Sequence, residues 1–243
     1  MNYLKKTKML SEISFFTGIK ELLSQNNILS ISGKSGTGKT ALVLQLVGNL
    51  LTYEELYTQS CIWIQANESF PVKRLRQIFA DYPEKRDYIN ENIFIIPQYN
   101  PIPTYLEQAS ILQQIISPST FLPPSLKFIV FDNISHHLRF EITQYANLNC
   151  LILLDSFYET QLLPLILFCK RNDIVLILIH EVTYSPSQER VRPFFYKLYD
   201  RIETIDVVLS NVCNSEKKNM FISFNRSQWN FQFLIVNNGI SIL

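Results

Sequence analysis

The sequence predicts an α/β fold: a mainly parallel, twisted sheet with helices on both faces and an antiparallel extension near its C-terminal end. Up to Thr183, short β-rich apolar runs alternate with longer stretches of helical periodicity. The apolar runs are continuous rather than alternating, which is typical of parallel strands covered on both faces. Beyond Thr183, strand-like runs follow one another with no helical pattern between them. These patterns together predict a doubly wound sheet that continues as a meander.

The predicted parallel strands share a run of branched or aromatic apolar residues beside polar or turn-forming residues. They are Ile28–Ser32, Cys61–Gln65, Ile93–Ile96, Lys127–Phe131 and Ile174–Ile179. The predicted antiparallel strands are Ile205–Ser210, Asn219–Asn225 and Phe231–Val236.

Helical patterns lie between the parallel strands. In the first of them Leu42, Leu46 and Leu50 recur at every fourth position, which places them on one face of a helix. The predicted helices are Thr40–Tyr53, Val72–Asp81, Tyr105–Ile116 and a stretch within Thr160–Arg171. Two proline-rich pieces, Pro97–Pro103 and Ser117–Ser125, are expected to be ordered loops. No domain boundary is evident, so we expect a single core domain over residues 10–243 after a tail at residues 1–9.

Composition excludes several classes of protein. The 243 residues are 47% hydrophobic and carry a formal net charge of +1, so no strong overall field draws the chain to nucleic acid or an anionic membrane. The four cysteines form no C-x-x-C pair, so neither a zinc site nor a redox pair is indicated. The N-terminus has no secretory pattern. The longest apolar run, Leu162–Cys169, is too short to span a bilayer. We therefore expect a soluble intracellular protein with no membrane segment.

A glycine-rich stretch, Gly33–Thr40 (GKSGTGKT), lies between the first predicted strand and the first predicted helix. It has the Gly-x4-Gly-Lys-Thr pattern of a phosphate-binding loop, in the strand–loop–helix context that the motif requires. Backbone N–H groups of such a loop converge on phosphate oxygens. Gly36 and Gly38 allow the tight backbone, Lys39 reaches the β- and γ-phosphates, and the Thr40 hydroxyl suits Mg²⁺. The predicted nucleotide-binding residues are Gly33, Lys34, Ser35, Gly36, Thr37, Gly38, Lys39 and Thr40.

Asp132 directly follows the predicted strand Lys127–Phe131. The carboxyl ends of parallel strands are where α/β sheets bind ligands. Together with Thr40, Asp132 is predicted to order Mg²⁺, directly or through water. The expected cofactors are therefore ATP and Mg²⁺. The alternative for Asp132 is an Asx turn or a helix cap.

Five segments resemble RecA-like strand-exchange recombinases, in the family's own order. Phe16–Leu23 (FTGIKELL) is similar to the segment before the phosphate-loop strand, which KaiC-like ATPases share in part. Cys61–Leu75 (CIWIQANESFPVKRL) resembles the strand that ends in the catalytic glutamate, and Phe128–Arg139 (FIVFDNISHHLR) resembles the Walker B strand with its trailing arginine. Val175–Val182 (VLILIHEV) is similar to the strand that senses the γ-phosphate, and Phe224–Ile240 (FNRSQWNFQFLIVNNGI) to the terminal strands.

This resemblance implies a RecA-like P-loop NTPase core, similar to archaeal RadB or to the short eukaryotic recombinase paralogues. It implies an ATP-binding accessory protein of homologous recombination and DNA repair, which assembles in a nucleotide-dependent way with a recombinase or with other paralogues. The modest lysine content and the abundance of Ser, Asn and Gln favour a eukaryotic protein, and hence the nucleus. An archaeal protein would instead be cytoplasmic.

The departures from the family pattern concern catalysis. A gapless alignment with the family puts Asn67 where its catalytic glutamate stands, and an amide cannot accept a proton as a carboxylate does. Glu68 is the next residue, and adjacent side chains at a strand end point to opposite faces unless a turn intervenes. Glu181 occupies the position of the sensor glutamine and follows His180. Glu68 and Glu181 are thus the candidate catalytic carboxylates, and we expect weak ATP hydrolysis or none.

DNA contact is predicted for the loop that corresponds to the family's second DNA-binding loop, Thr183–Lys197. Arg190, Arg192 and Lys197 interleave there with the aromatic run Phe194–Tyr196, a combination that suits single-stranded DNA. An ordinary solvated loop with buried aromatic residues is the alternative. Any DNA binding is expected to be weak and sensitive to salt.

Two other functions stay open at this point. One is a P-loop ATPase of KaiC-like or kinase type unrelated to recombination, although the chain shows no arginine-rich lid. The other is a purely structural partner in which the phosphate loop only stabilises the fold. Stabilisation of the protein by ATP would argue against the structural alternative.

Overall fold

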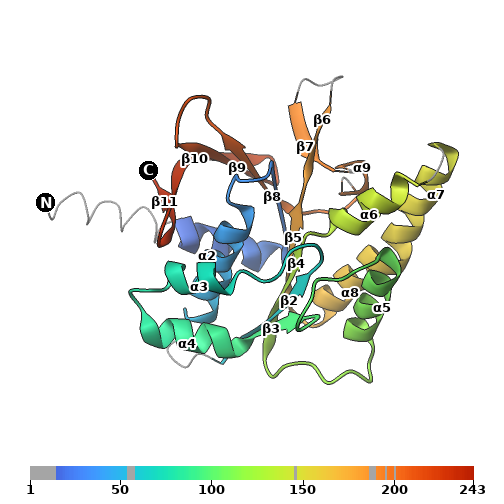
Figure 1. Cartoon of the computed structure of the whole chain (residues 1–243), viewed down its shortest axis with the longest axis horizontal. Coiled ribbons are helices and arrows are strands. Elements are labelled where there is room, and N and C mark those ends of the chain that lie inside the picture. The colour runs from blue at the N-terminus through green and yellow to red at the C-terminus, as the bar shows by residue number, and fades with distance from the viewer. Residues whose placement is uncertain (1–14, 54–57, 145–146, 186–189, 195, 200) are drawn as a thin grey trace, which may run out of the picture.

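The computed structural model describes residues 15–53, 58–144, 147–185, 190–194, 196–199 and 201–243, and their central feature is one large twisted sheet (Figure 1). Across this sheet the strands follow the order β11-β10-β9-β8-β1-β5-β4-β2-β3. The strands are β1 (Ile28–Gly33), β2 (Ser60–Gln65), β3 (Ile93–Ile96), β4 (Leu126–Asp132), β5 (Val175–His180), β8 (Ile205–Asn211), β9 (Lys218–Phe224), β10 (Ser227–Val236) and β11 (Gly239–Ile242).

The sheet has a parallel part and an antiparallel part. β1 pairs in parallel with β5 and with β8, and the pairs β4–β5, β2–β4 and β2–β3 are parallel as well. β8, β9, β10 and β11 then pair in antiparallel fashion. The predicted meander is present, but its first strand, β8, also belongs to the parallel part. The strand β11 was not predicted.

Helices cover both faces of the sheet (Figure 1). One face carries the helix at residues 15–25 with α2 (Lys39–Leu51), α3 (Val72–Ile78) and α4 (Pro83–Asn92). The other face carries α5 (Tyr105–Ile116), α6 (Ser135–Ile142), α7 (Asn147–Phe157), a short π-helical turn η1 (Tyr158–Leu162) and α8 (Leu163–Arg171). A separate two-stranded hairpin, β6 (Val182–Ser185) with β7 (Arg190–Pro193), projects from the C-terminal end of β5 and is followed by α9 (Tyr196–Tyr199).

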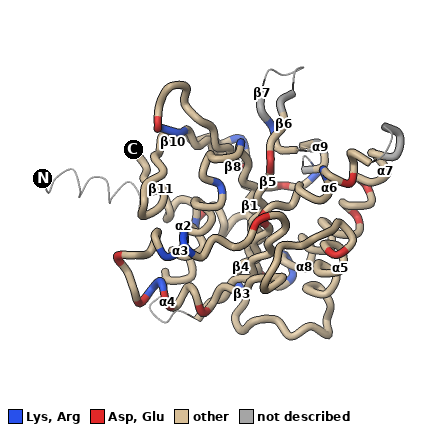
Figure 2. The backbone as a smooth tube through the Cα atoms, viewed as in Figure 1, with Lys and Arg blue, Asp and Glu red and all other residues tan. Residues whose placement is uncertain are grey.

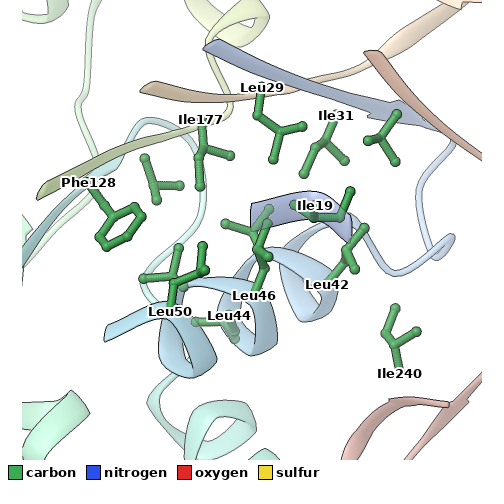
Figure 3. Packing of buried hydrophobic residues seen from close by; sticks show 14 of the residues in the cluster. Ile19, Leu29, Ile31, Leu42, Leu44, Leu46, Leu50, Phe128, Ile177 and Ile240 are labelled. Atoms are coloured by element: carbon green, nitrogen blue, oxygen red, sulfur yellow. The ribbon is translucent and has the colours of Figure 1, made fainter. Parts of the chain in front are cut away.

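The central parallel strands β2, β4 and β5 send alternate residues into two separate hydrophobic cores. In β5, Val175, Ile177 and Ile179 enter the core beneath α2, whereas Leu176 and Leu178 enter the core beneath α5 and α8. Figure 3 shows the first of these cores, where the leucines of α2 pack against β1 and β5. Because both faces are buried, both sets of positions must be apolar, which is why the strands have continuous apolar sequences.

The helices differ from expectation at several places. The helix predicted over Val72–Asp81 ends at Ile78, and α4 begins shortly afterwards at Pro83. Proline is favoured in the first turn of a helix, where its missing N–H has no partner to lose. The helices α4, α6 and α7 and the hairpin β6–β7 were not predicted.

One helical stretch, Cys150–Arg171, is long and apolar enough to cross a membrane by length and composition alone. It has 22 residues and a mean hydropathy of 1.5. The core helix of a soluble protein passes the same test, and the buried residues Phe157, Leu162 and Leu165 of this stretch belong to the second core. The stretch is therefore weak evidence for a membrane segment, and the absence of one stays a prediction.

Candidate nucleotide-binding site

The phosphate loop leaves β1 at Gly33 and enters α2 at Lys39, as the motif predicts. Gly36 and Gly38 have positive φ angles of 75° and 94°, which glycine adopts without steric cost. A Cβ atom on Gly33 would lie 2.8 Å from the carbonyl oxygen of Leu209. No side chain caps α2, so the N–H groups of its first turn keep the capacity to bind an anion.

The C-terminal hairpin β10–β11 packs directly behind this loop. A Cβ atom on Gly38 would lie 2.8 Å from Ile235 Cδ1 and 3.5 Å from Ile240 Cδ1. The Gln45 side chain of α2 donates a hydrogen bond to the backbone oxygen of Ile240 and accepts one from its N–H. The loop is therefore supported by the last two strands of the sheet.

Lys39 lies over the loop. Its Nζ donates hydrogen bonds to the carbonyl oxygens of Gly33, at 2.8 Å, and Lys34, at 3.2 Å. Burial lowers the Lys39 pKa, while the negative charges of Asp132, Glu181 and Glu68 act in the opposite direction. The ammonium group thus sits among three carboxylates.

Thr40 and Asp132 meet as predicted. The Thr40 hydroxyl donates a 3.0 Å hydrogen bond to Asp132 Oδ2. Burial raises the Asp132 pKa to about 6; the Thr40 hydrogen bond lowers it, and the nearby charge of Glu68 raises it further. A hydroxyl and a carboxylate at this spacing are oxygen ligands of the kind that Mg²⁺ takes together with phosphate oxygens.

Glu181 is held in place from three directions. Its Oε2 forms a 2.6 Å salt bridge with Arg139 Nη1. Its Oε1 accepts a 3.1 Å hydrogen bond from Asn133 Nδ2. Its backbone N–H donates to Ser135 Oγ at 3.1 Å. The neighbouring His180 is fully buried, and burial, with Lys39 nearby, lowers its pKa to about 3. Arg139, rather than His180, is therefore the group that balances the Glu181 charge.

Asn67 and Glu68 both line the pocket. β2 ends at Gln65, and the Ala66 N–H donates a 2.7 Å hydrogen bond to the Asp132 carbonyl oxygen. The chain bends after that point, so the alternation of a strand no longer applies. This bend allows the Glu68 side chain to line the pocket although Asn67 does so as well.

These side chains surround a pocket of about 530 Å³. That volume is within the usual range for small-molecule and cofactor sites. Asn133 and Arg139 line the pocket but were not predicted as site residues. The available signal was weak: Arg139 lies seven residues after the end of β4, and Glu181 directly follows β5. The lining residues are Gly33, Lys34, Ser35, Gly36, Gly38, Lys39, Thr40, Ala41, Asn67, Glu68, Asp132, Asn133, Arg139, Glu181 and Val182. Thr37, also predicted to bind nucleotide, is buried below the loop and bonds to Lys34 O through its N–H and its hydroxyl.

The predicted DNA-contacting residues lie elsewhere. Arg192, in β7, stacks its guanidinium 4.3 Å from the ring centroid of Tyr196 and lines a separate cavity of about 750 Å³. Arg190 is in β7 and Lys197 in α9, but their side chains lie outside the described residues. Figure 2 shows basic and acidic positions interspersed along the chain. The three residues therefore remain a prediction.

No protein-family model matches the chain. The chain is 28% identical over 121 residues to the DNA repair protein RAD57 of Saccharomyces cerevisiae, a match that spans 48% of this chain and 26% of the relative. It is also similar to the crystal structure of the RadB recombinase, with a TM-score of 0.66, 17% identity, and coverage of 88% of this chain and 89% of the other.

The chain has a RecA-like recombinase fold. The predicted fold class and the predicted resemblance to RecA-like recombinase paralogues are confirmed by these matches. In this RecA-like fold, the phosphate loop, Asp132 and Glu181 all lie at the carboxyl ends of the parallel strands β1, β4 and β5.

Proposed function

We propose that this chain is an ATP-binding accessory protein of homologous recombination and DNA repair. It acts as a nucleotide-dependent assembly module that joins a recombinase or other recombinase paralogues. The observation that carries the proposal is the phosphate loop Gly33–Thr40 with Thr40 Oγ1 and Asp132 Oδ2 at 3.0 Å. The likeness to a DNA repair protein and to a recombinase structure supports the biological context.

ATP–Mg²⁺ is the ligand in this proposal. The loop amides and Lys39 hold the phosphates, and Thr40 and Asp132 hold the ion. Mg²⁺ supplies charge neutralisation on the phosphate oxygens when it is bound. Hydrolysis is weak or absent, since Asn67 stands at the position of the general base and Glu68 must substitute for it.

The proposal also covers the domain organisation of the chain, its location in the cell and its contact with DNA. In this proposal residues 10–243 form one core domain after a tail at residues 1–9; residues 1–14 lie outside the part of the chain that the structure describes. The protein acts in the nucleus, which fits a role in DNA repair and the likeness to a yeast protein. Single-stranded DNA binding through Arg190, Arg192 and Lys197, if it accompanies this role, is weak and secondary to partner binding.

Thermal unfolding with and without ATP–Mg²⁺ tests the ligand. At a concentration a hundredfold above the dissociation constant, ATP stabilises the folded chain by about 2.7 kcal/mol, which raises the melting temperature by about 5–10 °C. Lys39→Ala abolishes this increase. Lys170→Ala, at an exposed lysine of α8 outside the pocket lining, retains it and serves as the matched control.

Affinity purification of the tagged full chain, with and without ATP–Mg²⁺, tests the assembly role. A recombinase or its paralogues co-elute in the presence of ATP and are lost from the Lys39→Ala variant. The proposal fails if ATP–Mg²⁺ does not change the melting temperature of the chain, alone or with its co-eluting partners.

A further inference from the structure

A negatively charged side chain lines the pocket that would receive a triphosphate. Glu181 and Lys39 line the same pocket of about 530 Å³. In a phosphate loop of this type, that lysine reaches the β- and γ-phosphates. A carboxylate beside such a lysine repels an incoming phosphate unless a second cation balances it.

Arg139 is that cation. It projects from the last turn of α6, and its Nη1 lies 2.6 Å from Glu181 Oε2. Asn133 Nδ2 occupies the other carboxylate oxygen at 3.1 Å. Both carboxylate oxygens are thus bonded to residues that follow β4: Oε2 to Arg139 and Oε1 to Asn133.

The ion pair is also fixed from the hairpin side. The Arg139 guanidinium lies 5.0 Å from the ring centroid of Phe194, within the range of a cation–π contact. The Phe194 N–H donates a 2.8 Å hydrogen bond to the Glu181 carbonyl oxygen. Arg139 is therefore ordered by both a carboxylate and an aromatic ring, although half of its side chain is exposed.

We propose that Arg139 is a positioning residue of the phosphate pocket: by pairing with Glu181 it makes the pocket accept a triphosphate and sets its preference for ATP over ADP. This inference rests on the proposed ATP-binding function and adds a residue to it. Without Arg139, the Glu181 carboxylate loses its salt-bridge partner and adds a negative charge to the pocket that Lys39 also lines. The third phosphate of ATP then meets repulsion that the two phosphates of ADP meet less strongly.

The test measures ATP and ADP affinities by calorimetry with Mg²⁺ for the full chain and its variants. Arg139→Gln weakens ATP binding about tenfold or more, while ADP binding changes by less than about threefold. Glu181→Gln alone binds ATP at least as tightly as the parent chain. The double variant Arg139→Gln/Glu181→Gln recovers ATP affinity to within about threefold, because the repulsive charge is gone.

The chain contains a close match for Arg139 that serves as a control. Arg201 forms a 2.8 Å salt bridge with Asp155, stacks over Tyr158 at 5.4 Å and has a similarly exposed side chain. It lies outside the lining of the phosphate pocket. Arg201→Gln leaves the ATP-to-ADP affinity ratio unchanged.

The inference is wrong if Arg139→Gln weakens ATP and ADP equally, leaves both unchanged, or is not rescued by Glu181→Gln. Arg139→Lys keeps the charge and the ATP preference. If the glutamine variant does not fold, Arg139→Ala replaces it, with the same expected loss of ATP affinity. If the parent chain binds neither nucleotide, the proposed function itself is contradicted. If it binds both, the ATP and ADP affinities of the variants decide whether Arg139 has the proposed role.

Discussion

The Thr40 hydroxyl donates a 3.0 Å hydrogen bond to Asp132 Oδ2, which joins the first turn of α2 to the end of β4. In the sheet, β5 lies between β1 and β4, so this bond connects groups on either side of an intervening strand. The bond brings the two predicted magnesium ligands together at the carboxyl edge of the sheet. It also links the N-terminal turn of α2 to the C-terminal end of β4.

Asp132 makes stability depend on pH. Burial raises its pKa from 3.8 to about 6, so the folded chain binds more protons than the unfolded chain between these values. Stability from this group therefore falls as the pH rises through that window, and above it the ionised carboxylate is a net cost. Asp132→Asn is expected to stabilise the nucleotide-free chain by about 1–2 kcal/mol at neutral pH and to have almost no effect near pH 4.

Urea unfolding of both chains across this pH range measures the difference. Asp155→Asn, at an exposed salt bridge, should show no comparable gain with rising pH. The same Asp132→Asn chain should lose stabilisation by ATP–Mg²⁺. A stability difference that does not vary with pH would show that Asp132 is not the buried acid described above.

Catalysis should respond to the residues that follow β2. Asn67→Glu restores a carboxylate in the pocket and is expected to raise ATP turnover, by up to about 10²–10⁴-fold if the new group acts as a general base. Glu68→Gln should lower whatever residual rate the natural chain has. Phosphate release is the measurement, with Lys39→Ala as the background. If the natural chain hydrolysed ATP as fast as a full recombinase, Asn67 at the general-base position would not be limiting hydrolysis.

Single-stranded DNA binding, if present, should depend on Arg192. Arg192→Gln removes one cation from the β6–β7 hairpin and should therefore remove about one phosphate contact. The slope of log K against log salt should become shallower by about 0.7. Fluorescence anisotropy at low and moderate salt measures this slope. Arg201→Gln is the control for an arginine outside the hairpin. An unchanged slope in Arg192→Gln would remove Arg192 from the predicted DNA contacts.

Gln45 should matter for stability because it completes two backbone hydrogen bonds in the core. Its Oε1 accepts from the Ile240 N–H at 2.6 Å, and its Nε2 donates to the Ile240 oxygen at 3.2 Å. Gln45→Ala leaves both backbone groups without these partners and is expected to cost about 2–4 kcal/mol. Gln113→Ala, an exposed position on α5, should cost less than about 0.5 kcal/mol. Equal losses in urea unfolding would contradict the role of Gln45.

The strands were predictable because burial on both faces leaves a simple signature. β5 shows it most clearly, since each of its apolar residues enters one core or the other. The helix α7 has no such signature: Leu151 and Ile152 are exposed while Phe157 is fully buried, so its apolar residues form no single stripe. The start of α4 carries a local signal, because Pro83 occupies its first turn.

In the site, local motifs were sufficient for the phosphate loop and for Asp132, because both follow directly from strands. The salt bridge between Arg139 and Glu181 depends on β4 and β5 being neighbours in the sheet, which spacing along the chain does not reveal. Two weak signals, an arginine after one strand and an acid after another, became a pair only in three dimensions.

The contact between Gly38 and the hairpin β10–β11 has a consequence for biosynthesis. The phosphate loop at residues 33–40 leaves the ribosome well before the hairpin at residues 227–242 that packs against it. A nascent chain therefore carries the complete motif before it has this support, so we expect the loop to reach its final geometry only after the hairpin has emerged.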